Sequence, residues 1–382
     1  MQPAEQIQIA ERLFDYIDNN ATATADEVYA QPVAEYTDRD TAKREQRTFF
    51  RQRPQCVGMS GLLAKPGSYT THDYCGLPLL LTRDRDGRFH AFLNVCRHRG
   101  ARVAEGCGSQ GAFVCPYHAW TYGLDGQLTA RPEEQAFRAA PREEHGLTEL
   151  PSLEHNGLLW VVPTPGASID MNAHLGDLGS EIASFNLGDF HYYDCRIMRR
   201  RMNWKLLVDT FLESYHFCVL HKDSICSIFY DNLTTFDNWG EHFRLVAARR
   251  TIEEIRHQPS EQWNLLPHMV GIYILFPNTV FVWQLDHVEL WQIYPGDDAP
   301  DESVVRLELY TPEPTVGESA IRHWENNLDL VVHVVENEDF PVGEGIQRGF
   351  YTSAQDHIVF GQNEPALAFF HRNVTRALTN SG

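Results

Sequence analysis

Residues 94–120 constrain the fold of this chain more than any other stretch. They read NVCRHRGARVAEGCGSQGAFVCPYHAW and hold three cysteines and two histidines within 27 positions. The pattern is Cys96-x-His98 followed by Cys115-x2-His118, so each pair joins one thiol to one imidazole. Two short loops must therefore meet around a zinc ion, a disulfide or a redox centre.

Composition argues against the disulfide and against two classes of partner. The chain has 382 residues and eight cysteines, too few for a disulfide scaffold, and clustered Cys and His in a reducing compartment more often bind metal. Its 32 basic and 52 acidic residues give a net charge of −20, which repels nucleic acid and anionic membrane surfaces. The N-terminal residues are acidic, and no apolar run is long enough to span a membrane, so we expect a cytoplasmic protein.

The mixing of ligand types within each pair favours an iron–sulfur cluster over zinc. Zinc fingers usually supply a close pair of cysteines and then a close pair of histidines. A cluster in which one iron keeps two thiolates and the other takes two imidazoles needs one ligand of each kind from each loop. We therefore predict a [2Fe–2S] cluster bound by Cys96, His98, Cys115 and His118. Glycines suited to tight loops occur at positions 100, 106, 108 and 111.

The rest of the chain divides into a β-rich part and an α+β part. Residues 4–18 have helical periodicity, and a hairpin turn is predicted at Asp86-Gly87. Strand-like apolar bursts lie at 77–82, 89–95 and 158–163. A stretch rich in Gly, Pro and Ser at 163–180 indicates a boundary. The elements predicted beyond it are a helix at 203–221, antiparallel strands within 272–311, and helices near 318–338 and 364–379.

The motifs Cys96-x-His98-Arg99-Gly and Cys115-Pro-Tyr-His118-Ala-Trp resemble the Rieske domain of the Rieske non-haem iron oxygenases. Respiratory and photosynthetic Rieske proteins are the near alternative, but they carry an extra, disulfide-forming cysteine in each loop. Cys107 has no such counterpart in the second loop, which favours the oxygenase branch.

The resemblance implies an α+β chain of three parts. An N-terminal helical segment (1–45) packs on the catalytic domain. A β-rich Rieske [2Fe–2S] domain (46–165) follows. The last part (166–382) is a helix-grip, START-like catalytic domain, in which an antiparallel sheet holds a mononuclear non-haem iron.

The predicted helix 203–221 is the place to look for that iron. Two histidines and one carboxylate leave half of an octahedron open, which is typical of iron(II) oxygenases. His216 and His221 are five residues apart, an interval that rotates their side chains by about 140° on a regular helix. The helix must therefore end or distort between them if they share a metal. The alternative is a regular amphipathic helix with Asp209, Glu213 and His216 as a polar stripe.

The resemblance implies three ligands for the mononuclear iron. The family places two histidines in a D/E-x2-H-x4-5-H stretch, which falls on His216 and His221, and a later aspartate, which falls on Asp339. The sequence supports Asp339 independently, because it continues an apolar helical face by four residues beyond Val335. A carboxylate on such a face needs a partner. Glu336 and Glu338 compete with Asp339 and are expected to be solvated.

The resemblance also implies an electron path between subunits. In the family an acidic residue ahead of the first histidine connects a Rieske histidine of one subunit to an iron histidine of its neighbour. Here Glu213 has that position, between His118 and His216, and Asp209 is a weaker candidate for a supporting role. The implied assembly is a homotrimer. The chain has no GxGxxG loop and no four-cysteine ferredoxin pattern, so NAD(P)H must be oxidised on a separate reductase, directly or through a ferredoxin.

The predicted function is that of a terminal oxygenase component, which uses O2 and these electrons to hydroxylate an aromatic or related small organic substrate. Glutamate at position 213 departs from the aspartate of the aromatic-ring dioxygenases and resembles members that act on quaternary amines. Hydroxylation or demethylation of a quaternary amine or a methyl ether is therefore an open alternative. Two other classes remain, a Rieske electron carrier and a zinc-stabilised binding protein. The long chain after the Rieske domain argues against the carrier, and iron analysis would exclude zinc.

Overall fold

The computed structural model describes residues 1–74, 76–296 and 299–380, which fall into two compact units. The first unit consists of Met1–Thr48, Leu175–Asn186 and Phe190–Gly382, and the second of Phe49–His174 and Leu187–Asp189. The boundaries proposed from the sequence were 45/46 and 165/166, which lie three and nine residues before the divisions at 48/49 and 174/175. None of the helices in the described residues combines the length and the hydropathy that crossing a membrane requires.

The second unit is β-rich and forms three small antiparallel sheets. Their strand orders are β10-β5-β4-β3-β6, β11-β12-β2 and β7-β8-β9. The predicted hairpin joins β4 to β5, and Gly87 adopts a positive φ of 80° in its turn. The strands are β2 (Gln55–Met59), β3 (Ser68–Tyr74), β4 (Leu77–Arg83), β5 (Phe89–Leu93), β6 (Cys107–Ser109), β7 (Ala112–Val114), β8 (Thr121–Gly123), β9 (Leu128–Ala130), β10 (Glu149–Leu150), β11 (Ser152–His155) and β12 (Leu158–Val161).

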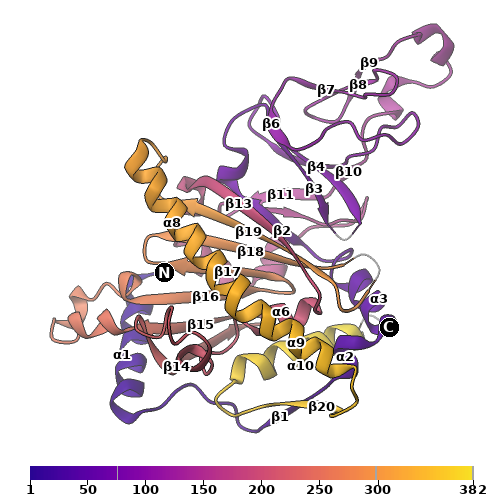
Figure 1. Cartoon of the computed structure of the whole chain (residues 1–382). Helices are drawn as coiled ribbons and strands as arrows, with labels where there is room; N and C mark the ends of the chain where they lie inside the picture. Colours follow the sequence, from indigo (N-terminus) through magenta and orange to yellow (C-terminus); the bar gives the residue numbers. More distant parts are fainter. Residues whose placement is uncertain (75, 297–298, 381–382) are drawn as a thin grey trace. The chain divides into compact units, whose positions relative to one another are not determined.

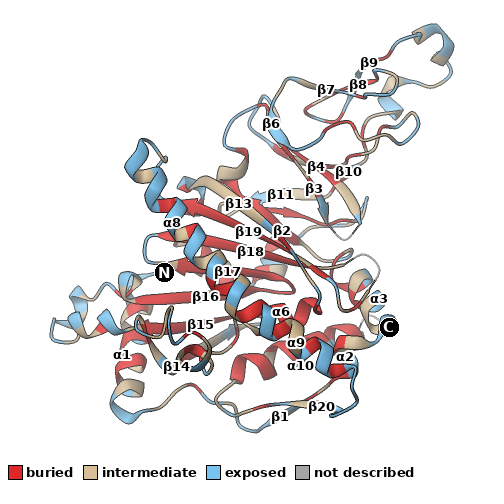
Figure 2. Cartoon of the chain, in the orientation of Figure 1, coloured by how far each residue is buried: buried red, intermediate tan, exposed pale blue. Residues whose placement is uncertain are grey.

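The first unit is built on a seven-stranded antiparallel sheet with the order β13-β19-β18-β17-β16-β15-β14. The four strands predicted within 272–311 are confirmed and form its centre. These strands are buried along most of their length (Figure 2), as their near-continuous apolar sequences require. The strands are β13 (His191–Arg200), β14 (Phe229–Trp239), β15 (His242–Arg249), β16 (Met269–Leu275), β17 (Thr279–Gln284), β18 (His287–Pro295) and β19 (Ser303–Thr311). A separate pair, β1 (Tyr29–Pro32) and β20 (His357–Phe360), is also antiparallel.

Helices cover this sheet, and Figure 1 shows α8 running across one face of it. A ring contact of 5.4 Å between His287 of β18 and Trp324 of α8 joins the two layers. The helices predicted at 4–18 and 364–379 are confirmed. The helices of the first unit are α1 (Pro3–Asn19), α2 (Ala34–Thr37), α3 (Arg39–Thr48), α5 (Leu178–Ala183), α6 (Trp204–Asp209), α7 (Phe217–Leu220), α8 (Glu318–Val334), α9 (Phe340–Phe350) and α10 (Pro365–Asn380). Helix α4 (Met171–Leu175) lies largely in the second unit.

The prediction of one helix over 203–221 is wrong. The Asn203 side chain caps α6 by accepting from the Lys205 N–H at 2.9 Å, but α6 ends at Asp209 and α7 begins only at Phe217. His216 and His221 flank α7 as its N-cap and C-cap residues. This interruption is the distortion that two histidines five residues apart need if they share a metal.

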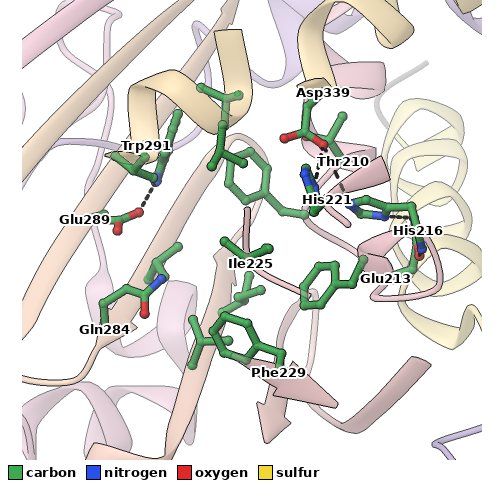
Figure 3. Close-up of a pocket in the computed structure, with 18 residues that line it drawn as sticks. Thr210, Glu213, His216, His221, Ile225, Phe229, Gln284, Glu289, Trp291 and Asp339 are labelled. Atoms are coloured by element: carbon green, nitrogen blue, oxygen red, sulfur yellow. Dashed lines mark hydrogen bonds and ion pairs between the residues drawn. The ribbon is translucent and has the colours of Figure 1, made fainter. Parts of the chain in front are cut away.

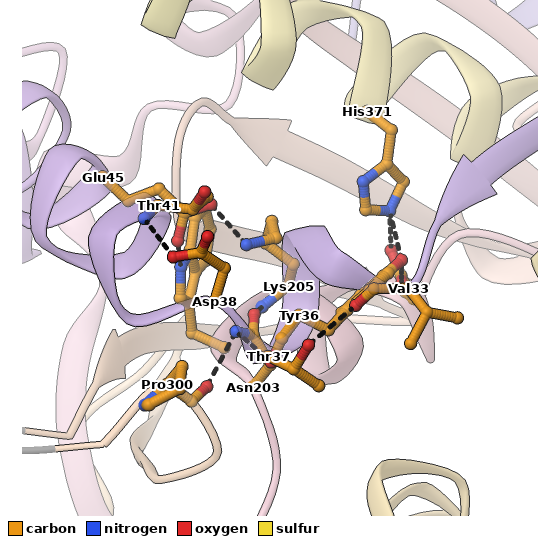
Figure 4. A network of polar contacts seen from close by, with 12 residues as sticks. Val33, Tyr36, Thr37, Asp38, Thr41, Glu45, Asn203, Lys205, Pro300 and His371 are labelled. Atoms are coloured by element: carbon orange, nitrogen blue, oxygen red, sulfur yellow. Dashed lines mark hydrogen bonds and ion pairs between the residues drawn. The ribbon is translucent and has the colours of Figure 1, made fainter. Parts of the chain in front are cut away.

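A buried ion pair ties α3 to α6 (Figure 4). Glu45 and Lys205 contact each other with side chains that are 1% and 0% exposed. The indole Nε1 of Trp204 donates to the second Glu45 oxygen at 2.9 Å. The Glu45 carboxylate is thus the acceptor that compensates a fully buried ammonium group.

We expect Glu45→Gln to destabilise the first unit by about 3–5 kcal/mol, because it leaves the buried Lys205 charge uncompensated. The midpoint of urea unfolding, followed by tryptophan fluorescence, measures the change. Lys43→Ala on the same helix is the control, because its pair with Asp40 is exposed on both sides and should matter little. Equal midpoints for the two variants would contradict this role of Glu45.

Candidate active site

The two Cys/His loops of the second unit have the same backbone design. In the first, the Gly100 N–H donates to the Cys96 carbonyl at 2.9 Å, and in the second the Ala119 N–H donates to the Cys115 carbonyl at 3.0 Å. The residues that close the turns have positive φ, 86° at Gly100 and 55° at Ala119. Each loop therefore folds back on itself and presents one thiol and one imidazole.

Two of the four predicted cluster residues lie in the apolar core of the second unit, and the other two have rings close to each other. Cys96 and Cys115 are free thiols and are 2% and 3% exposed, within the apolar core of the unit. The rings of His98 and His118 are 4.6 Å apart, centroid to centroid. Their Nδ1 atoms are buried and have no hydrogen-bond partner among the described residues. Buried imidazole nitrogens without partners are costly unless a metal takes their lone pairs, so the donor set fits a Rieske cluster.

Tyr122 contacts one of these thiols. Its hydroxyl lies 3.3 Å from Cys96 Sγ and accepts from the Arg97 N–H at 3.0 Å, which leaves the O–H free to donate to sulfur. Burial, followed by the Cys96 contact, raises the pKa of Tyr122, so the hydroxyl keeps its proton. Hydrogen bonds to cluster sulfur favour the reduced, more negative state.

Tyr122→Phe should therefore lower the reduction potential of the cluster by on the order of 50 mV, the equivalent of one hydrogen bond for a one-electron couple. A potentiometric titration of the cluster signal measures the shift. Tyr69→Phe is the control, because that hydroxyl donates to the Glu105 carbonyl instead. An unchanged potential in Tyr122→Phe would show that the contact with Cys96 does not tune the cluster.

In the first unit, the turn between α6 and α7 sets the position of His216. The Glu213 carboxylate accepts from the backbone N–H groups of Tyr215 and His216 and from Nδ1 of the His216 ring. One carboxylate thus fixes both the turn and the ring orientation. The Nε2 atom of His216 is left to face Asp339, at 3.6 Å from its Oδ1 atom.

Asp339 comes from a π-helical turn, Val335–Asp339, between α8 and α9. A π turn adds one residue to the helical repeat and re-aims the side chain that follows, and such turns are frequent at functional sites. Asp339 is 8% exposed, and its Oδ1 atom is 3.3 Å from Nε2 of His221. One ligand atom from each of His216, His221 and Asp339 lies within 4.8 Å of the others (Figure 3).

In the triad of His216, His221 and Asp339, each imidazole has a glutamate carboxylate at its Nδ1 atom. His221 Nδ1 donates to Glu338 Oε2 at 2.5 Å, as His216 Nδ1 donates to Glu213. Burial alone would lower the pKa of His221, but the carboxylates of Asp339 and Glu338 raise it above its ordinary value. Two Nε2 atoms with one carboxylate oxygen, backed by carboxylates on both Nδ1 atoms, fit a divalent transition metal.

Three further acidic residues, Glu338, Glu336 and Asp209, have different contact partners, and one of them contacts the triad. Glu338 was expected to be solvated, but it contacts His221, because the π turn carries it inward. Glu336 contacts Arg200 instead. The Asp209 carboxylate accepts from the Tyr36 hydroxyl at 2.8 Å and contacts His371 Nε2 at 2.8 Å, so any support it gives to the triad stays a prediction.

His221 lies within a short loop that is closed by a disulfide, which the sequence analysis did not predict. Cys218 and Cys226 form a disulfide, with Cα atoms 4.8 Å apart. Both cysteines lie within five residues of His221 in the chain, on either side of it. Their short spacing was the available signal, but the low cysteine content favoured free thiols.

A cavity of about 110 Å³ adjoins the triad. Its walls are largely apolar, with aliphatic side chains from β16, β17 and α8. The aromatic residues that line it are Phe211, Phe217, Phe229 and Trp291. Small-molecule sites commonly occupy about 300–1,000 Å³, so this smaller cavity restricts the ligand to a compact molecule.

Two family models match this chain. Residues 53–151 match the Rieske [2Fe-2S] domain, and residues 186–380, half of the chain, match the catalytic domain of the ring hydroxylating alpha subunit. The chain is 26% identical over 339 residues to the carnitine monooxygenase oxygenase subunit of Acinetobacter baumannii, covering 86% of each chain. It is 31% identical over 346 residues to the chloroplastic choline monooxygenase of Amaranthus tricolor, covering 86% of this chain and 73% of the relative.

Solved structures share the fold. The quaternary ammonium Rieske monooxygenase CntA, in complex with L-carnitine, superposes with a TM-score of 0.78 at 19% identity and covers 91% of this chain and 95% of its own. Naphthalene 1,2-dioxygenase from Rhodococcus sp. superposes with a TM-score of 0.73 at 17% identity and covers 99% and 98%. With both family models matched in order along its length, the chain belongs to the Rieske oxygenases, the oxidoreductases whose catalytic subunit joins a Rieske [2Fe–2S] domain to a ring-hydroxylating catalytic domain.

Proposed function

We propose that this chain is the terminal oxygenase component of a monooxygenase that acts on a small quaternary amine. Cys96, His98, Cys115 and His118 would hold the [2Fe–2S] cluster, and a mononuclear iron(II) would lie between His216, His221 and Asp339. When bound, the cluster supplies single electrons and the mononuclear iron activates O2. The electrons come from NAD(P)H through a separate reductase or ferredoxin.

One observation carries the proposal. The Nε2 atoms of two histidines face one oxygen of a buried aspartate at 3.3 and 3.6 Å, and an apolar cavity opens beside them. Two imidazoles and one carboxylate occupy one side of a metal and leave positions for O2 and substrate on the other. A zinc-stabilised binding protein needs neither the open positions nor the cavity.

The side chains around the triad have distinct tasks in this scheme. Glu213 and Glu338 accept from the Nδ1 atoms and so fix the imidazole orientations, with both Nε2 atoms directed toward Asp339. Phe211, Phe217 and Trp291 exclude water from the cavity, which protects the oxidising chemistry from side reactions. The net reaction inserts one oxygen atom into a C–H bond and releases the other as water, which consumes a pair of electrons and a pair of protons.

Glu213 also supports electron transfer between subunits. It contacts His216, and it lines a second cavity of about 310 Å³ whose rim carries exposed apolar side chains. Val342, Ile346 and Val359 on that rim are 46%, 42% and 67% exposed. A neighbouring Rieske domain would cover this surface and bring its His118 to Glu213, so we propose a homotrimer. A solved quaternary ammonium Rieske monooxygenase that oxidises carnitine has given insights into inter-subunit electron transfer in that enzyme.

Co-expression of two inactive variants tests this arrangement. His118→Ala removes a cluster ligand, and Asp339→Ala removes a ligand of the mononuclear site. If electrons cross between subunits, mixed oligomers regain part of the activity, because some active sites pair an intact cluster with an intact iron. Mixed oligomers without activity would contradict inter-subunit transfer.

The substrate class rests on the relatives and on the cavity. Two relatives are named carnitine and choline monooxygenases, whose substrates are quaternary amines. Hydroxylation of an aromatic ring is the second candidate, favoured by the aromatic side chains in the cavity wall.

Oxygen uptake with a surrogate reductase distinguishes oxidation of a quaternary amine from hydroxylation of an aromatic ring. We expect uptake with quaternary amines and formation of an aldehyde by C–N cleavage or alcohol oxidation. Uptake with aromatic acids alone would contradict the amine assignment.

A further inference from the structure

The wall formed by β18 brings a buried carboxylate to the cavity. Among the described residues that line it, Glu289 is the one charged side chain besides Glu213 and the triad. Glu289 is 4% exposed, and Figure 3 shows it across the cavity from His216, His221 and Asp339. Nothing in the proposed metal chemistry requires a charge at this position, and burying one costs free energy.

The contacts of Glu289 leave part of its acceptor capacity unused. Its Oε2 atom accepts from the Trp291 indole N–H at 3.1 Å, and its Oε1 atom lies 3.8 Å from His287 Nε2. An ionised carboxylate offers about four lone-pair sites. A buried carboxylate with one close hydrogen bond therefore still attracts positive charge from within the cavity.

Two basic side chains, those of Arg249 and His287, lie near Glu289, and neither lines the cavity among the described residues. The Arg249 guanidinium donates to the Gln284 side-chain oxygen at 2.6 Å and lies 4.9 Å from the Phe229 ring centroid. His287 is also bound to Asp286, at 3.2 Å. Burial lowers the pKa of Arg249, while the Glu289 carboxylate opposes this shift. A ligand in the cavity therefore meets the Glu289 carboxylate and the Gln284 amide, and the two basic side chains do not line the cavity.

Aromatic faces accompany the carboxylate. Trp291 follows it by two residues on the same face of β18, and the Trp291 ring meets Phe211 edge to face at 5.1 Å. Aromatic faces attract cations, most strongly where water is excluded. A carboxylate beside an indole, in a small apolar cavity, is a suitable environment for an alkylated ammonium group.

We propose that Glu289, together with Trp291, binds the positively charged group of the substrate and so selects cations over neutral molecules of the same shape. This inference rests on the proposed function and names the residue that sets its substrate class. Because the cavity is small, the carbon that is oxidised at the triad lies only a few bonds from the charged nitrogen.

A pair of matched probes tests the inference. Choline and 3,3-dimethylbutan-1-ol have nearly the same shape, but only choline is charged. Calorimetric titration of the anaerobic holoenzyme measures both dissociation constants. We expect choline to bind at least about tenfold more tightly than its neutral isostere. Glu289→Gln should reduce this preference to about twofold or less by weakening choline binding alone.

Asp286→Asn is the matched control, because it removes a carboxylate of the same hairpin that does not line the cavity among the described residues. It should keep the full preference for choline. Iron content and the cluster spectrum establish that each variant is folded. If Glu289→Gln does not fold, Glu289→Asp takes its place and should show an intermediate preference.

Three results would overturn the inference: equal binding of the two probes by the wild type, binding of neither, or an undiminished preference in the folded Glu289 variant. Failure of the proposed function gives a different result from failure of the Glu289 inference. In that case quaternary amines support no oxygen uptake, whatever the binding preference. Uptake with these amines, combined with equal binding of the probes, would leave the function standing and remove the role of Glu289.

Discussion

Asp339→Ala is expected to abolish turnover and to remove the mononuclear iron while the cluster stays in place. Among the described residues, the Asp339 carboxylate is the one anionic group that contacts both Nε2 atoms of the triad. Without it, two neutral imidazoles remain, too few to retain iron(II) against chelators. Iron should fall from about three to about two atoms per chain, with acid-labile sulfide unchanged.

Two variants on the same helical segment control for this result. Asp329→Ala removes an exposed acid of α8, and Glu336→Ala removes a carboxylate that contacts Arg200. Both should keep about three irons per chain. An Asp339→Ala protein that keeps its full iron content would mean that the metal, if any, lies elsewhere.

Glu213→Gln is expected to slow turnover by about 10–100-fold without loss of either metal centre. Glutamine can still accept from His216 Nδ1, so the ring keeps its orientation, but the negative charge that we propose lies between the two redox centres is gone. In single-turnover experiments the reduced cluster should be reoxidised more slowly by O2, while its reduction by the reductase is unaffected.

Glu213→Asp distinguishes the effect of the negative charge from the effect of side-chain length. It keeps the carboxylate but shortens the side chain by one methylene, so it should lose activity only if the contact with His216 is broken. Wild-type rates of cluster reoxidation in Glu213→Gln would remove Glu213 from the electron path. Loss of iron in that variant would instead make it a structural support of His216.

Much of the fold was predictable because its signals are local. The near-continuous apolar runs of β16 to β19 and the hairpin at Asp86-Gly87 follow from short stretches of sequence. The same holds for the Cys/His loops, whose mixed ligand order predicted one thiol and one imidazole per loop. In the structure the two thiols lie in one apolar core and the two imidazole rings are 4.6 Å apart, and their buried Nδ1 atoms have no hydrogen-bond partner among the described residues.

The rest depended on tertiary structure. Periodicity predicted one helix over 203–221, but the Glu213 side chain competes for backbone N–H groups and ends the helical path before α7. The inward position of Glu338 follows from the π turn, which no local propensity reveals. Glu289 was not singled out from the sequence, because only the folded sheet shows that its side chain lines the cavity.

Nitric oxide binding to the anaerobic, reduced holoenzyme tests the central claim most directly. Nitric oxide gives a distinctive paramagnetic signal only with an iron(II) that has an open position, as two histidines and one carboxylate would leave it. We predict this signal in the wild type, beside that of the reduced cluster, and its loss in His221→Ala with the cluster signal unchanged. A nitric oxide signal that persists in His221→Ala, or that never forms in the iron-loaded wild type, would contradict the assignment of the active site.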